Sequence, residues 1–190
     1  MNIKDYGNKL SLNISKISQI GNTNTLVNAI SLDIIEMVKC YAYDGDIFYK
    51  KEDLVNSCAS YAYGYGWLDA GTFLGYINGN SENGLIDNID DLISVSLQNH
   101  LLEKTNRYQK MLSSALDGVY ICPDIGTRLN VSANDILNRV SLIKDDGDTK
   151  YENNDLINAL FLYSYIYGWL DVGVRTGLFG IKGDRHLFTI

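Results

Sequence analysis

Proline is almost absent from this sequence. Pro123 is the only one among 190 residues, where an average usage of about 5% would give roughly ten. Because β-rich chains with many turns seldom have so little proline, the scarcity favours a mostly helical protein. No apolar run approaches the ~18–20 residues of a membrane-spanning helix, and the first residues lack the apolar core of a signal peptide. We therefore expect a cytoplasmic protein that does not bind a membrane.

Residues that often carry chemistry are also few. The three cysteines, Cys40, Cys58 and Cys122, form no CxxC pair, so we expect core thiols and no disulfide framework or zinc site. The two histidines, His100 and His186, are expected at the surface and leave little material for a catalytic site. No phosphate-binding loop or zinc-protease motif occurs. The pattern favours a non-enzymatic protein without cofactor or metal, although it leaves activity open.

Positive charge is scarcer than negative charge. The chain has 16 lysines and arginines against 23 acidic residues, for a net charge of −7. Nucleic-acid binding draws much of its energy from neutralising phosphates, so no nucleic-acid partner is expected. Two acidic clusters, at 44–46 and 145–148, lack the spacing of an EF-hand loop and are interpreted as solvated acidic faces.

What the sequence does contain is a repeat. Residues 44–77 and 146–179 align without gaps at an offset of 102, with 16 of 34 positions identical. The match is clearest between YAYGYGWLDAG (61–71) and YSYIYGWLDVG (163–173). It indicates a tandem duplication. The predicted organisation is a first unit at 1–78, a loop with a connector helix at 79–98, and a second unit at 99–190.

Each unit is predicted to be an antiparallel three-helix bundle, so the fold class is all-α. A glycine- and asparagine-rich loop at 78–84 precedes a segment, 85–119, whose apolar spacing predicts one long helix. The DGD sequences are placed inside the second helices, and strands are limited to a short pairing of the tail at 187–190. The predicted helices are 4–20, 23–49 and one after Asp53 in the first copy, and 100–118, one from Ser132 and one after Asp155 in the second.

The third helix of each copy is apolar on two sides. One side carries a 4-3-4-3 seam from Leu54 and from Leu156, which faces the other helices of its unit. The opposite side carries a second apolar stripe, and such helices are usually covered on both sides. We call these the outer stripes, and we predict that they pack on each other about an approximate two-fold axis, unless residues 85–101 cover them. The outer stripes are Tyr63, Trp67 and Ala70 in the first copy and Tyr165, Trp169 and Val172 in the second.

Asp69 and Asp171 interrupt this apolar surface. A carboxylate there needs a hydrogen-bond partner to offset its desolvation. We predict that both are buried with a partner inside their own unit. The alternative is that they face a ligand beside Trp67 and Trp169.

The second copy resembles a known family. The residues NDLINAL (154–160) and YSYIYGWLDVGVRTGLFGIKGDRHLFTI (163–190) are similar to a small archaeal family catalogued as domain of unknown function 357. Members typically resemble a single three-helix unit, so this chain resembles two fused copies. The first copy departs from the pattern, with Phe73-Leu74 where the second has Arg175-Thr176. The resemblance implies the fold and brings no established activity.

Two functions therefore remain. The leading hypothesis is a non-enzymatic interaction or assembly module that associates with itself or with a protein partner. The alternative is a small-molecule or nucleotide-binding protein that uses the Trp-Leu-Asp positions. An enclosed polar pocket at these positions would favour the alternative, and dry packing would favour the module. The candidate positions are Tyr63, Trp67, Asp69, Tyr165, Trp169 and Asp171.

Overall fold

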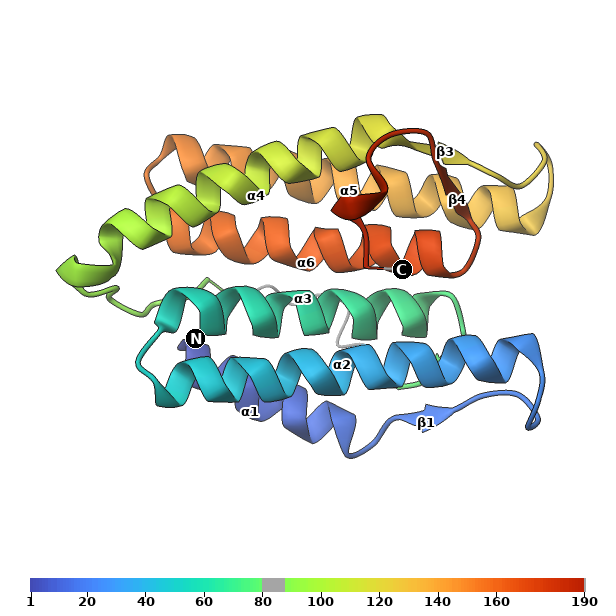
Figure 1. The fold of residues 1–190 in the computed structure, drawn as a ribbon, viewed down its shortest axis with the longest axis horizontal. Helices are drawn as coiled ribbons and strands as arrows, with labels where there is room; N and C mark the ends of the chain where they lie inside the picture. The colour runs from blue at the N-terminus through green and yellow to red at the C-terminus, as the bar shows by residue number, and fades with distance from the viewer. Residues whose placement is uncertain (80–87, 190) are drawn as a thin grey trace.

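The chain folds into two units of three helices each. The computed structural model describes residues 1–79 and 88–189, and within them it contains six α-helices and four very short strands (Figure 1). This confirms the all-α class with two tandem three-helix units. No described helix is long and apolar enough to cross a membrane. The helices are α1 (Ile3–Ile14), α2 (Leu26–Lys50) and α3 (Leu54–Phe73) in the first unit, and α4 (Gln98–Gly118), α5 (Arg128–Glu152) and α6 (Leu156–Arg175) in the second.

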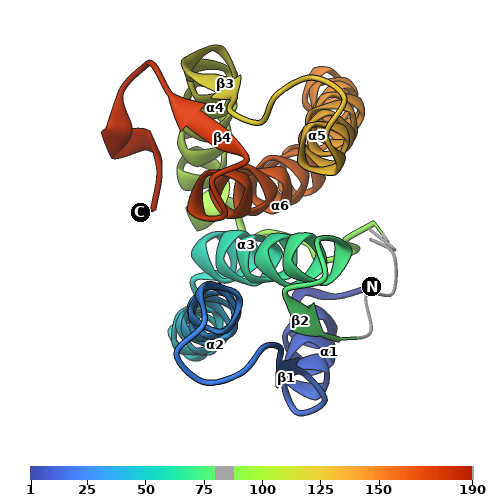
Figure 2. The same cartoon turned by 90° about the vertical axis from the view of Figure 1, so that its right-hand side faces the viewer.

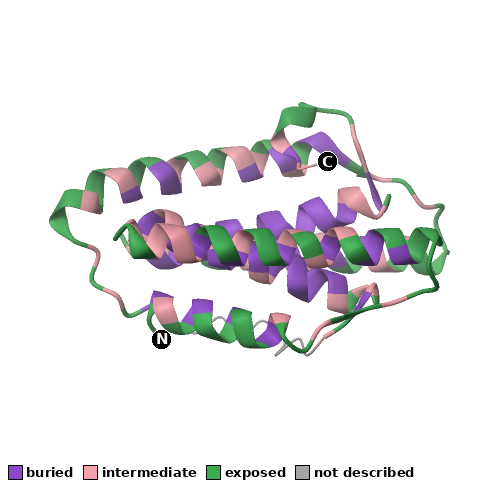
Figure 3. Ribbon diagram, turned by 60° about the horizontal axis from the view of Figure 1, so that its bottom comes forward, coloured by how far each residue is buried: buried purple, intermediate pink, exposed green. Residues whose placement is uncertain are grey.

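The two third helices form the centre of the molecule. Figure 2 shows α3 against α6, with α1 and α2 on the outer side of α3 and with α4 and α5 on the outer side of α6. Every residue of α6 from 156 to 173 is buried, and Figure 3 shows the burial concentrated in this central pair. A helix that is apolar all round is stable only when neighbours cover all of it. The arrangement meets this requirement for both copies.

Short antiparallel strands close one end of each unit. β1 (Ser18–Gln19) pairs with β2 (Ile77–Asn78), and β3 (Val119–Ile121) pairs with β4 (Phe179–Ile181). The pairing predicted for the tail is therefore wrong in its position. The described tail instead makes a single 3₁₀ turn, η2 (Arg185–Leu187), because the Asp184 side chain accepts a hydrogen bond from the backbone of His186.

Two helix predictions need correction. α1 ends at Ile14 instead of residue 20, because the chain turns there into β1. Within the described part of the predicted long helix at 85–119, the α-helix begins at Gln98, after a 3₁₀ turn η1 (Val95–Leu97). Residues 88–94 have no regular structure, and residues 80–87, with most of the predicted loop, lie outside the described residues.

The segment before η1 is held by its contacts with both units. Asp90 binds the N-terminal amine at 2.7 Å, and Asp91 accepts from the backbone N–H of Ile3 at 2.5 Å. The backbone N–H of Ile89 donates to the Asn158 side chain at 2.7 Å. These bonds tie the segment to the start of the chain and to α6, and residues 88–94 follow these contacts instead of a helical pattern.

The DGD sequences lie inside α2 and α5, as predicted. Their glycines lie under a tyrosine ring of the third helix: a Cβ on Gly147 would be 2.8 Å from Cε1 of Tyr163. The Tyr163 hydroxyl then donates to Asp148 at 2.6 Å, and Tyr61 donates to Asp46 at the same distance. Burial raises the pKa of Asp148, but hydrogen bonds from Lys144 and Tyr163 outweigh it and leave this pKa below its usual value. The last aspartate of each DGD is thus a structural acceptor and not part of a solvated face.

Gly147→Ala is expected to destabilise the chain by about 1–2 kcal/mol. Alanine gains about 1 kcal/mol in helix propensity, but its methyl group meets the Tyr163 ring and costs more through overpacking. Urea denaturation measures the difference. The control is Asp146→Ala at an exposed neighbour, which should stay within about 0.5 kcal/mol of the parent. A Gly147→Ala chain at least as stable as the parent would contradict the tyrosine-docking role.

Candidate functional site

The outer stripes meet where α3 crosses α6 at a pair of glycines. A Cβ on Gly168 would lie 2.7 Å from the carbonyl oxygen of Tyr63 and 3.0 Å from Cα of Gly66. A Cβ on Gly66 would overlap the carbonyl of Tyr165. The two helices therefore touch backbone to backbone, and only glycine fits at the crossing.

A reciprocal pair of hydrogen bonds flanks this crossing. The Tyr165 hydroxyl donates to Asp69 at 2.8 Å, and the Tyr63 hydroxyl donates to Asp171. The residues of one bond correspond to those of the other at the offset of 102, so the contacts follow an approximate two-fold relation. Reciprocal contacts of this kind define an isologous interface, here inside one chain.

Both carboxylates are buried, as predicted: Asp69 is 4% exposed and Asp171 is fully buried. Asp171 also has a partner in its own unit, because the backbone N–H of Thr189 donates to it at 3.3 Å. The sequence did not predict a tyrosine from the opposite copy. This partner could not be predicted because the alignment of the two repeats does not show which residues of one copy contact the other.

The indoles lie in the same interface. Trp67 and Trp169 are buried, and the ring of Trp169 lies 5.6 Å from the ring of Phe73 in α3 and 4.9 Å from the guanidinium of Arg139. The predicted packing of one outer stripe on the other is confirmed by the glycine crossing and by the reciprocal Tyr–Asp bonds. The competing cover, the segment from residue 88, instead contacts the start of the chain and Asn158.

Burial sets the electrostatics of the interface. It raises the pKa of Asp171 to about 7, although hydrogen bonds from Thr189 and the charge of Arg175 act in the opposite direction. Burial, followed by the charge of Asp69, raises the pKa of Tyr165 well above its usual value. Both shifts have the same main cause, which is that burial in the interface disfavours the charged form of each group.

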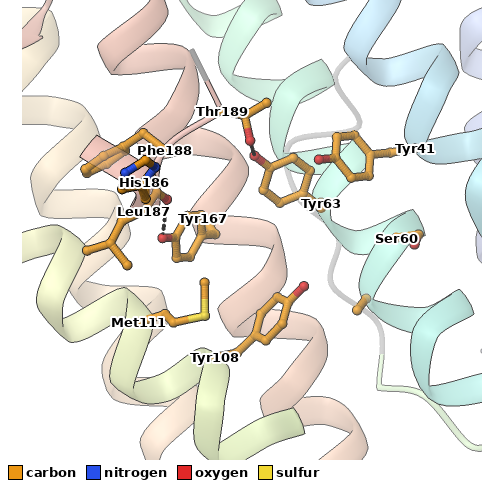
Figure 4. Close-up of a pocket in the computed structure, with 11 residues that line it drawn as sticks. Tyr41, Ser60, Tyr63, Tyr108, Met111, Tyr167, His186, Leu187, Phe188 and Thr189 are labelled. Carbon is orange, nitrogen blue, oxygen red and sulfur yellow. Dashed lines mark hydrogen bonds between the residues drawn. The ribbon is translucent and has the colours of Figure 1, made fainter. Parts of the chain in front are cut away.

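An open space lies beside this interface, and we call it the tyrosine cavity. Its volume is about 200 Å³, and the rings of Tyr41, Tyr63, Tyr108 and Tyr167 line it together with the C-terminal tail (Figure 4). The tail is fixed there because Tyr167 donates to the carbonyl of Leu187 and the Thr189 hydroxyl lies 3.1 Å from that of Tyr63. Of the candidate positions predicted from sequence, only Tyr63 lines this cavity.

Sequence reasoning missed both the crossing and the cavity. Gly66 and Gly168 are identical at the offset of 102 and stand mid-helix, which was a usable signal for close approach. For the cavity, the signal was a difference between the copies, Ala59 against Phe161. The expected core thiols are correct only for Cys58, because Cys40 and Cys122 are exposed.

Within residues 1–79 and 88–189, no group of three or more His, Cys, Asp or Glu side chains is placed to hold a metal ion. The comparison with curated proteins and the comparison with solved structures gave no match. Two segments, 5–77 and 107–179, match the family described as a protein of unknown function (DUF357). Together the two segments cover most of the sequence, so the chain belongs to the DUF357 family, as two tandem copies.

Proposed function

We propose that this chain is a non-enzymatic assembly module in which α3 and α6 join two DUF357 units as a fused pair. One observation carries the proposal: the glycine crossing of Gly66 and Gly168 is flanked by two reciprocal Tyr–Asp bonds. Backbone contact at a crossing gives close packing, and buried hydrogen bonds to a carboxylate fix the register. Such a surface suits specific pairing of like units.

The pairing uses the outer stripes inside one chain. The fused pair is therefore proposed to be monomeric, and a protein partner would bind the outer helices. The absence of a nucleic-acid or membrane partner, a cytoplasmic location and an archaeal origin stay predictions. Ligand binding at the Trp-Leu-Asp positions has less support, because both indoles are buried and both carboxylates accept a tyrosine hydrogen bond.

The proposal predicts that the units associate when they are separate chains. Residues 1–79 and 88–190, produced as two polypeptides, are expected to form a one-to-one complex in analytical ultracentrifugation. Tyr165→Phe in the second polypeptide should weaken the complex about tenfold or more, because it removes the hydroxyl that donates to the buried Asp69 across the interface, at a cost of about 1–3 kcal/mol.

Tyr151→Phe is the matched control for this experiment. Its hydroxyl also donates a hydrogen bond, at 2.5 Å, but to Asn106 of its own unit, so its loss should leave the association constant within about twofold. Polypeptides that are each folded and stay apart at all concentrations would contradict the assembly function. Equal effects of the two substitutions would contradict the role of the Tyr165–Asp69 bond.

A further inference from the structure

The tyrosine cavity breaks the two-fold relation between the copies. Ala59 stands on its wall, and the corresponding residue of the second copy is Phe161. The Phe161 ring is buried and packs 4.6 Å from the ring of Tyr6. Tyr6 corresponds to Tyr108 at the offset of 102, so the cavity occupies the place that a phenylalanine ring fills on the other side.

At two further positions that line the cavity, the first copy has a polar side chain and the second copy an aliphatic one. Tyr41 stands where the second copy has Ile143, and Ser60 stands where it has Leu162. The first copy thus has hydroxyl groups at two positions where the second copy is aliphatic. Together with the missing ring at Ala59, the changes make one side of the interface hollow and polar while the rest of it stays packed.

The cavity has aromatic faces and few cationic side chains around it. Among the described residues that line it there is no lysine or arginine, although His186 is one of them, and the Arg175 guanidinium lies 3.5 Å from the carbonyl oxygen of Thr189. The Asp171 carboxylate accepts from the Tyr63 hydroxyl behind one wall, and after burial the negative charge of Asp171 and then of Asp44 also raises the pKa of Tyr41. The Lys104 ammonium lies 5.3 Å from the centroid of the Tyr108 ring, so this ring already has a cation over one face.

Aromatic faces carry partial negative charge, and several tyrosines around one space are the chemistry that recognises alkylammonium groups. An anion would meet these negative ring faces, which disfavours it. A volume of about 200 Å³ lies below the usual range of about 300–1,000 Å³ for drug-sized ligands. We propose that the tyrosine cavity binds a small alkylammonium cation, with Tyr41, Tyr63, Tyr108 and Tyr167 around the cationic group.

The test uses the full chain and two ligands of the same shape. Choline and its neutral carbon analogue, 3,3-dimethylbutan-1-ol, are titrated separately by isothermal titration calorimetry at pH 8. Sodium chloride keeps the ionic strength equal. Choline is expected to bind saturably with one-to-one stoichiometry, and the neutral analogue at least tenfold more weakly. Absence of saturable choline binding, or equal binding of both ligands, overturns the proposal.

Variants taken from the second copy locate the site. Ala59→Phe should abolish choline binding by filling the cavity, whereas the same change at the exposed Ala29 of α2 should leave the dissociation constant within twofold. Circular dichroism checks that each variant is folded. If the Ala59→Phe chain does not fold, Tyr41→Ile replaces it in the test, and this variant should bind choline at least fivefold more weakly than the parent. Unchanged choline binding in a folded Ala59→Phe or Tyr41→Ile chain overturns the assignment to this cavity.

Discussion

Gly66→Ala is expected to destabilise the chain by about 3 kcal/mol or more, at the upper end of what overpacking usually costs. The added methyl group would overlap the carbonyl of Tyr165, which is backbone and cannot rotate away. Relief would require α3 and α6 to move apart, and that movement would also loosen the Tyr–Asp bonds on either side. Urea denaturation of the full chain measures the loss, and Gly168→Ala should act in the same direction because its methyl group would meet the carbonyl of Tyr63 at 2.7 Å.

The same helix offers a matched control. A methyl group on Gly64 would meet Cδ2 of Leu10 at 3.1 Å and Cβ of Tyr41 at 3.4 Å, and it would lie at an ordinary contact distance of 3.6 Å from the carbonyl oxygen of Val38. The first of these is the end of a flexible side chain, and alanine gains about 1 kcal/mol in helix propensity. Gly64→Ala should therefore stay within about 1 kcal/mol of the parent. Similar free energies of unfolding for Gly64→Ala and Gly66→Ala would show that the crossing is not the tight contact described above.

The parts of the fold that follow from periodicity could be predicted from sequence. Apolar spacing of three and four identified α3 and α6, and their second apolar side indicated a cover on both faces. The repeat then predicted what covers the second side, because two related apolar stripes with no other cover favour packing on each other. The prediction failed where the apolar spacing favoured a helix but contacts with residues far away in the sequence favoured another conformation. The predicted helix from residue 85 was wrong for this reason, since Asp90 and Asp91 bind the start of the chain.

The site was harder to predict because its features depend on pairs of residues far apart in sequence. Gly66 becomes necessary only once a second backbone lies against it. A glycine inside a helix indicates a close approach, but it does not show which helix approaches. The partner of Asp69 is Tyr165, 96 positions away. The cavity depends on a ring missing at Ala59 in one copy, which is visible only when the two copies are superposed on the same interface.

The pH dependence of stability should distinguish the parent chain from Asp171→Asn. The pKa of Asp171 in the folded chain is raised to about 7 by burial, against the lowering effects of Thr189 and Arg175, whereas an unfolded aspartate titrates near 3.9. The folded state therefore holds more protons than the unfolded state between these values. The stability contributed by the protonated carboxyl is fully present below about pH 4 and is lost as the pH rises through 7.

Asparagine imitates the protonated carboxyl and does not titrate. Its oxygen accepts from the Thr189 backbone, and its amide donates to the Tyr63 hydroxyl. Between pH 5 and pH 8 the parent chain is expected to lose about 2–3 kcal/mol relative to Asp171→Asn, which is the part of the roughly 4 kcal/mol for the whole pKa difference that falls in this pH range. Urea denaturation at each pH measures the two chains under identical conditions, so groups that both chains share cancel. The control Asp146→Asn removes an exposed carboxylate of α5 and should run parallel to the parent. A parent chain that also runs parallel to Asp171→Asn would mean that Asp171 is ionised inside the interface throughout this range.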